Sequence, residues 1–294
     1  MRPSQFIGGM ATRRGTAGKE IKSPILNRRA VFRSLACIRV FPFSAAMPLR
    51  CHAIVDTAHQ QVQIWKSERQ CEFRVAGAIH AWWHEKRYLT GLAWDNLAAA
   101  ALLRPQGPPR SILMLGLAGG TAMRILRQLL PDCRLVAVDI DQEIVALAEL
   151  NMRLDDLGIE IHFGDAYAWI AKCKERFDVV IDDVYLAGSD DVFRPGKSDT
   201  GQITALKRLL KPGGLILANL VNGAGHRAMQ IRTRAAFREG FPVVRSVTTP
   251  ASMNETLVGG IDVLPASALN PWKASFSEAS DRKLWQVLKV RKLK

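Results

Sequence analysis

The stretch SILMLGLAGGT, residues 111–121, decides the fold. A short apolar run that ends in a glycine turn is typical of a buried parallel strand leading into a helix. Helical spacing of apolar residues follows over residues 121–130, and the next apolar run, residues 135–138, indicates a second buried strand. The stretch therefore predicts a β-α-β unit.

The same alternation continues downstream. Asp141 is placed to cap a helix that reaches Met152, and residues 159–163, 177–181 and 215–220 have the character of further strands with helices between them. Two later runs, residues 241–247 and 255–263, predict an antiparallel edge pair. We expect an α/β protein with a Rossmann-like, mostly parallel sheet covered by helices on both faces.

A different pattern precedes the glycine turn. Apolar residues alternate along residues 61–66 and 71–75, which predicts half-buried strands of a small β module, and residues 88–103 predict a helix that ends at the breaker PQGPP. We therefore divide the chain into a basic tail (1–46), a β module with a linker helix (47–105), a cofactor-binding catalytic domain (106–265) and a basic C-terminal tail or helix (266–294).

Charge is concentrated at the two ends of the 294-residue chain. Of the net charge of +14, residues 1–46 carry +8 and residues 271–294 carry +5, which leaves +1 for the body. A nucleic-acid-binding core would carry the charge in its folded part, so nucleic acid is not an expected partner of the core. The tail 1–46 is expected to be disordered or targeting-like. Translation from Met47, or a tail that binds nucleic acid or anionic lipid, are the alternatives.

Other classes of protein are disfavoured by composition. No window of 18 apolar residues suggests a membrane span, and the five cysteines form no C-x-x-C pair that would suggest a metal site or a disulfide framework. We expect a cytoplasmic protein without metal and without a membrane partner.

Candidate ligand-binding residues follow four of the predicted strands. In sheets of this kind, ligands bind at the carboxyl ends of the strands. The glycine turn, with Gly116 and Gly119, follows the first strand. Asp139 follows the second and is placed to accept hydrogen bonds from ribose hydroxyls. Asp165 and the N–H of Ala166 follow the third and suit an adenine ring, although Asp165 also suits a helix cap.

The fourth strand ends in two adjacent acids, Asp182 and Asp183. Successive side chains of a strand point in opposite directions, so at most one of them faces a pocket. An acid here could orient or deprotonate an attacking amine, and Asp183 is our candidate catalytic residue. Together, the four strand ends predict an S-adenosylmethionine-type cofactor on a seven-stranded methyltransferase-type sheet.

The motifs VDID, GDAYAWI and FDVVIDDVY, within roughly residues 55–265, resemble the spermidine synthase-like (polyamine aminopropyltransferase) family. The resemblance implies a small N-terminal β domain, a homodimer, and transfer of an aminopropyl group from decarboxylated S-adenosylmethionine to an amine such as putrescine. It also implies that Gln60, Asp139 and Asp165 contact the cofactor and that Asp183 is the catalytic acid.

The sequence departs from this family in its polyamine half. Gly119 stands where the family's glycine loop has an Asp that holds the aminopropyl amine, and Trp94-Asp95-Asn96 replaces a Tyr-His-Glu run. The family's Gly-Val-Ile-Gln reads Gly77-Ala78-Ile79-His80, where we expect His80 to pack at the domain junction. Asp95, Asp183, Asp190 and Asp191 remain as possible amine-binding acids.

Three functions therefore stay open. The first is aminopropyl transfer, and the second is methyl transfer from intact S-adenosylmethionine to an unknown substrate, which loss of the loop acid favours. The third is a non-catalytic nucleotide-binding protein, which the four ligand-type strand ends disfavour.

Overall fold

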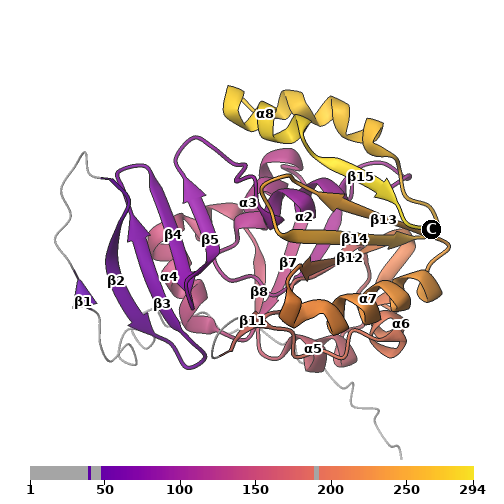
Figure 1. Cartoon of the computed structure of the whole chain (residues 1–294), viewed down its shortest axis with the longest axis horizontal. Coiled ribbons are helices and arrows are strands. Elements are labelled where there is room, and N and C mark those ends of the chain that lie inside the picture. Colours follow the sequence, from indigo (N-terminus) through magenta and orange to yellow (C-terminus); the bar gives the residue numbers. More distant parts are fainter. Residues whose placement is uncertain (1–38, 41–47, 189–191) are drawn as a thin grey trace, which may run out of the picture.

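The computed structural model describes residues 39–40, 48–188 and 192–294. Two sheets stand side by side in it, a small N-terminal sheet and a larger mixed sheet (Figure 1). The expectations for the tail 1–46 fall almost wholly outside the described residues, as do Asp190 and Asp191.

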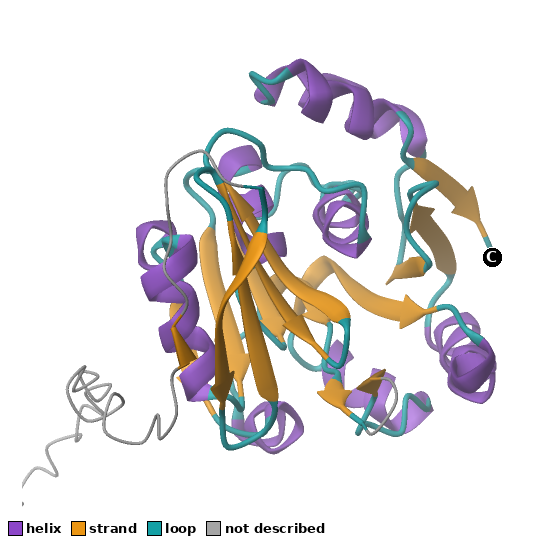
Figure 2. Ribbon diagram, turned by 60° about the vertical axis from the view of Figure 1, so that its left-hand side comes forward, coloured by secondary structure: helices purple, strands orange, loops and turns teal. Residues whose placement is uncertain are grey.

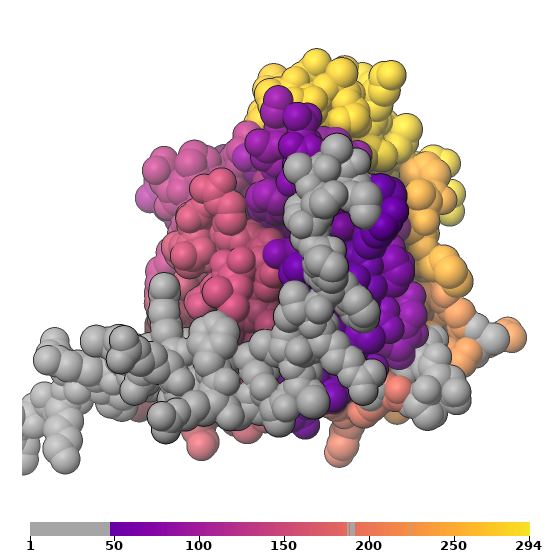
Figure 3. Space-filling view, turned by 90° about the vertical axis from the view of Figure 1, so that its left-hand side faces the viewer, coloured from indigo at the N-terminus to yellow at the C-terminus, as the bar shows by residue number. Residues whose placement is uncertain are grey.

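The N-terminal sheet is an antiparallel meander, as the alternating residues predict. Its strands are β2 (Arg50–Asp56), β3 (Gln61–Lys66), β4 (Gln70–Val75) and β5 (Ala78–His84), and the two-residue β1 (Arg39–Val40) pairs with β2. This sheet comes forward in Figure 2. Figure 3 views the molecule from its side, with the yellow C-terminal residues at one end.

The main sheet has the strand order β15-β13-β14-β12-β9-β6-β7-β8. Its parallel part consists of β6 (Ser111–Leu115), β7 (Arg134–Asp139), β8 (Glu160–Phe163), β9 (Phe177–Asp182) and β12 (Leu210–Val221). The strands β13 (Val243–Thr248) and β14 (Asn254–Gly260) form the expected antiparallel pair. The order reverses direction at β6, so the topological switch point lies at the carboxyl ends of β6 and its neighbours.

The sheet has one strand more than the seven expected. Residues Lys289–Lys292, assigned above to a C-terminal tail, form β15, which pairs with β13. Sequence patterning misses this strand because three of its four residues are charged, and only Val290 is apolar. The domain boundary expected at residue 265 therefore cuts off the last strand of the sheet.

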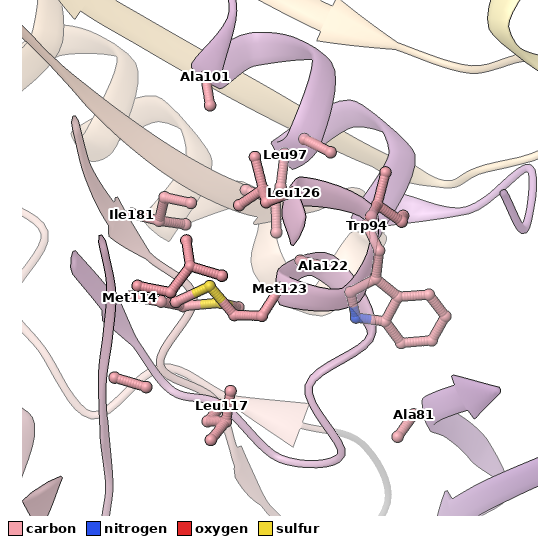
Figure 4. Packing of buried hydrophobic residues seen from close by; sticks show 14 of the residues in the cluster. Ala81, Trp94, Leu97, Ala101, Met114, Leu117, Ala122, Met123, Leu126 and Ile181 are labelled. Carbon is pink, nitrogen blue, oxygen red and sulfur yellow. The ribbon is translucent and has the colours of Figure 1, made fainter. Parts of the chain in front are cut away.

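Helices cover both faces of the sheet, because alternate residues of each buried strand point to opposite sides. Ile112 and Met114 pack on one side with α2 (Ala93–Ala101), α3 (Thr121–Leu129), α4 (Gln142–Met152) and the N-terminal sheet. Figure 4 shows Met114 in this cluster with Leu97 of α2 and Met123 of α3. Leu113 and Leu115 pack on the other with α5 (Ala166–Lys172), α6 (Thr200–Lys207) and α7 (Arg227–Gly240).

The short elements complete the chain. They are the hairpin β10 (Leu186–Ala187) with β11 (Val192–Phe193), the 3-10 helices η1 (Leu154–Leu157), η2 (Ala224–His226) and η3 (Ala266–Ser275), and the helix α8 (Ala279–Gln286). None of the helices in the described part of the chain is long and apolar enough to cross a membrane.

Helix α2 is shorter than predicted and belongs to the main domain. It begins at Ala93 rather than near residue 88, because the Asp95 carboxylate accepts hydrogen bonds from the N–H groups of Thr90 and Gly91 and holds them in a turn. The helix contacts α3, β12, β13 and β14. It is therefore a layer of the main domain and not part of the β module.

Candidate active site

A cavity of about 510 Å³ opens at the carboxyl ends of β6, β7, β9 and β12. Its size lies within the range of small-molecule sites, about 300–1,000 Å³. The N-terminal sheet supplies one wall and the loop before β14 another. Among the predicted site residues, the cavity brings together Gln60, Gly116, Asp139, Asp165, Ala166 and Asp183.

Of the two adjacent acids, Asp183 faces this cavity and Asp182 does not. The Asp183 Oδ1 atom accepts a 2.7 Å hydrogen bond from Asn219 Nδ2, at the end of β12. Burial raises the pKa of Asp183 to about 7, although the Asn219 hydrogen bond and the charge of Arg194 act to lower it. A carboxyl with such a pKa can both accept and release a proton near neutrality.

Asp182 is held on the opposite side of the strand. Its carboxylate forms an ion pair with Arg194, at 2.8 Å, and accepts a hydrogen bond from Gln202 Nε2, also at 2.8 Å. Both ion-pair side chains are almost fully buried, with exposures of 1% and 3%. Arg194 also donates to the carbonyl oxygen of Asn219. Asp182 therefore stabilises the strand ends that carry Asp183 and Asn219.

Asp139 anchors the glycine turn. Its Oδ2 atom accepts hydrogen bonds from the N–H groups of Leu117, at 2.6 Å, and Ala118, at 2.8 Å, and its Oδ1 atom accepts from Asp141 N–H. A carboxylate offers about four acceptor positions, so three are occupied by the protein's own backbone. Any ribose contact adds to this structural role, which the sequence alone did not reveal.

The β2–β3 turn of the N-terminal sheet reaches the same end of the cavity. Gln60 Nε2 and the Thr57 hydroxyl both donate to Asp141 Oδ2. The other oxygen of Asp141 accepts from Ile144 N–H and caps α4, as predicted. These bonds fix the N-terminal sheet against the main domain beside Asp139.

Asp165 combines two features that the sequence suggested. Its Oδ1 atom accepts from Ala168 N–H and caps α5. The side chain is exposed and lines the cavity together with Ala166. One carboxylate oxygen and the unbonded N–H groups of the first helical turn are thus available to a ligand.

Two expected site residues do not face the cavity. Gly119 is absent from its lining, and a Cβ atom at this position would lie 2.3 Å from Ala81 Cβ on β5. The loop packs so closely on β5 that no side chain fits. Asp95 is also outside the cavity and completely buried, where it holds the turn before α2.

Neither Asn219 nor His80 was assigned to the site from the sequence, although both line the cavity. Asn219 interrupts the apolar run LILANLV at a strand end, which is a detectable signal, and its Oδ1 atom accepts from Asn254 Nδ2. His80 was expected in a packed junction, but it lines the cavity. Its position results from strand pairing, for which the sequence holds no local signal.

Comparison with known proteins identifies the family. A family model described as "Spermine/spermidine synthase domain" matches residues 97–258, more than half of the chain. The chain belongs to this family. The match includes the glycine turn, Asp139, Asp165, Asp183 and Asn219, so most of the cavity lies within the family domain.

Two curated relatives match this chain over only part of their own length. A probable polyamine aminopropyl transferase of Bifidobacterium longum is 33% identical over 134 residues, which are 45% of this chain and 28% of that protein. The eEF1A lysine and N-terminal methyltransferase homolog of Drosophila melanogaster is 28% identical over 196 residues, 63% of this chain and 28% of that protein. The matched part thus spans less than a third of either relative's length.

The fold has solved counterparts. A probable spermidine synthase from Corynebacterium glutamicum superposes with a TM-score of 0.63 at 14% identity, covering 86% of this chain and 91% of that chain. This similarity confirms the expected architecture of a small N-terminal sheet beside a mixed, mostly parallel sheet.

Proposed function

We propose that this chain transfers an alkyl group from an S-adenosyl sulfonium to an amine. The observation that carries the proposal is Asp183, a carboxyl with a pKa of about 7 that lines the cavity at the switch point of the sheet. The family domain makes aminopropyl transfer from decarboxylated S-adenosylmethionine to an amine such as putrescine the first form of this activity.

The cavity residues fit the adenosine part of such a ligand. Asp165 has an oxygen available for the exocyclic amine of adenine, and Ala166 N–H follows it at the start of α5. Asp139 keeps one acceptor position for a ribose hydroxyl. Gln60 supports the same region through Asp141, and the positive φ of Gly116 lets the loop turn beside the ligand.

The sulfonium supplies an electrophilic carbon attached to a good leaving group. The protein's part is to present the amine nitrogen to that carbon, which is mainly a matter of position. Asn219 holds Asp183 Oδ1, and no described residue donates a hydrogen bond to Oδ2, which is therefore available to an incoming N–H. Asp183 then accepts the proton that the nitrogen loses, and its raised pKa makes it a stronger base for this transfer than an ordinary carboxylate.

Methyl transfer from intact S-adenosylmethionine is the second form, and Gly119 favours it. In this structure, the position where the family carries an acid for the aminopropyl amine faces Ala81 and has no room for a carboxylate. Similarity to an eEF1A lysine and N-terminal methyltransferase homolog agrees with this form.

The leaving group distinguishes the two forms. The purified full chain would be incubated with decarboxylated S-adenosylmethionine plus putrescine, or with S-adenosylmethionine plus a panel of amines, and the products separated by chromatography. Methylthioadenosine marks aminopropyl transfer, whereas S-adenosylhomocysteine marks methyl transfer. Asp183→Asn is the negative control. Failure to bind methylthioadenosine, S-adenosylhomocysteine or either sulfonium would refute the proposal.

A further inference from the structure

His80, in the cavity wall, lies at an irregularity in the pairing of two strands. The pairing of β4 with β5 joins Phe73 to Ala81 and then Arg74 to Ile79, so His80 lies between these pairs as a β-bulge. A bulge turns a side chain away from the regular alternation and is common beside active sites. Here the displaced side chain lines the cavity.

The position of His80 is fixed by contacts on its C-terminal side. Ala81 packs against Gly119 of the glycine turn. The N–H of Trp82 donates to the Thr121 hydroxyl, which donates in turn to the Trp82 carbonyl oxygen. Strand β5 is thus attached to the loop and to the start of α3, and His80 is held beside the loop at which the family places its amine-binding acid.

Both ring nitrogens of His80 are available for hydrogen bonds to a ligand. No described residue forms a hydrogen bond or ion pair with its nitrogens, and burial lowers the pKa of the imidazole. The ring is therefore neutral at pH 7 and offers one N–H donor and one acceptor nitrogen.

Four acids line the cavity, Asp139, Asp141, Asp165 and Asp183, and all of them follow strands of the main sheet, whereas the other parts of the wall carry no acid. The glycine turn and the start of α2 contribute Gly116, Leu117, Ala118, Leu92, Ala93 and Trp94 to the cavity, none of which is ionisable. An ammonium group buried here without a counter-ion would be strongly disfavoured. A zwitterionic amino-acid group brings its own counter-ion, and a neutral imidazole can donate to its carboxylate or accept from its ammonium.

We propose that His80 recognises the amino-acid tail of the bound cofactor and selects the zwitterionic tail of intact S-adenosylmethionine over the cationic tail of the decarboxylated form. The inference rests on the S-adenosyl site proposed above and decides between its two forms. His80 is then a specificity-determining residue in a place where the family uses a carboxylate on the loop.

Calorimetry with three stable thioethers tests this assignment. S-adenosylhomocysteine has the zwitterionic tail, its decarboxylated analogue has only the amine, and methylthioadenosine has neither. The wild-type chain should bind S-adenosylhomocysteine about tenfold to a hundredfold more tightly than the decarboxylated analogue, the range expected for one hydrogen bond to a charged group. His80→Ala should abolish that preference and leave methylthioadenosine binding within twofold.

A second variant and a matched control sharpen the result. His80→Asp restores an acid to this wall and should reverse the preference in favour of the decarboxylated analogue. His52 also lies at a bulge of the same sheet, between Cys51 and Ala53, but does not line the cavity. His52→Gln should therefore behave as wild type.

Two results would overturn the assignment while leaving the proposed function intact. In the first, methylthioadenosine binds but the wild type prefers the decarboxylated analogue or shows no preference. In the second, the preference survives in His80→Ala. If the wild type binds none of the three thioethers, the proposed function fails, and the assignment of His80 fails with it.

Discussion

Replacing Asp183 with Asn should make the protein more stable and less active at the same time. The Asn219 hydrogen bond can persist in the variant, because Asn also offers an oxygen to Asn219 Nδ2. What the variant loses is a negative charge that the folded chain tolerates poorly. A carboxylate that served stability alone would not be kept at this buried position. A variant that gains stability and loses activity therefore assigns Asp183 to function and not to folding.

The size of the stability gain depends on pH. Burial places the pKa of Asp183 at about 7 instead of its ordinary 3.8, and each pKa unit corresponds to about 1.4 kcal/mol. Ionisation in the folded state therefore costs up to about 4 kcal/mol. Because the folded state binds the proton more tightly than the unfolded state, wild-type stability falls as pH rises from about 4 to 7, and the full loss is present above 7. The advantage of Asp183→Asn should be largest at pH 8 and vanish below pH 4.

Thermal unfolding measured at pH 4, 6 and 8, together with turnover at pH 8, tests this reasoning. Turnover should fall about 10²–10⁴-fold, the usual contribution of a positioned acid–base group. Asp182→Asn is the matched control. It removes the partner of buried Arg194 and should cost about 3–5 kcal/mol of stability. A variant Asp183→Asn that is destabilised at pH 8, or that retains full turnover, would refute the assignment of the two acids.

Three further changes have outcomes that the structure specifies. Asp139→Ala should lose cofactor affinity in calorimetry and also about 1–3 kcal/mol of stability, since Leu117 and Ala118 lose their acceptor; unchanged affinity would exclude the ribose contact. Gly119→Asp should lower the melting temperature by overpacking against Ala81, whereas Gly225→Asp, which meets no atom within 4 Å, should not. A chain that starts at Met47 loses only the short pairing of β1 with β2 among described contacts, and should melt and bind methylthioadenosine as the full chain does; a large drop in melting temperature would contradict this.

The sequence predicts the positions of the strand ends well because they depend on local patterns. Short apolar runs such as residues 112–115 and 179–181 lie within fully buried parallel strands. The carboxyl ends of such strands meet at one edge, so Asp139, Asp165 and Asp183 fall around one cavity without any further information. The sequence also predicts that only one of Asp182 and Asp183 faces the cavity, because side chains alternate along a strand, but it does not show which one.

Other features of the site depend on contacts between segments that are distant in the sequence, and local sequence patterns do not reveal such contacts. Asp139 was interpreted as a ligand-binding acid, but its bonds to Leu117 and Ala118 arise only once the glycine turn folds back on β7. Gly119 was included among the cofactor-binding residues from its place in the loop, although it packs against Ala81 of the other sheet. Arg194 lies in a polar loop, and nothing local shows that its side chain is buried against Asp182.

The positive charge of the C-terminal segment also acquires a structural explanation. Lys289, Arg291 and Lys292 are exposed on β15, the strand at one edge of the main sheet. An edge strand presents unpaired N–H and C=O groups that could pair with another chain, and charged side chains, lysine above all, oppose such pairing. Part of the +5 charge of residues 271–294 thus protects the end of the sheet. Since β15 pairs with β13 along its whole length, these cations serve the fold, and the basicity of this segment gives no reason to assign it a nucleic-acid partner.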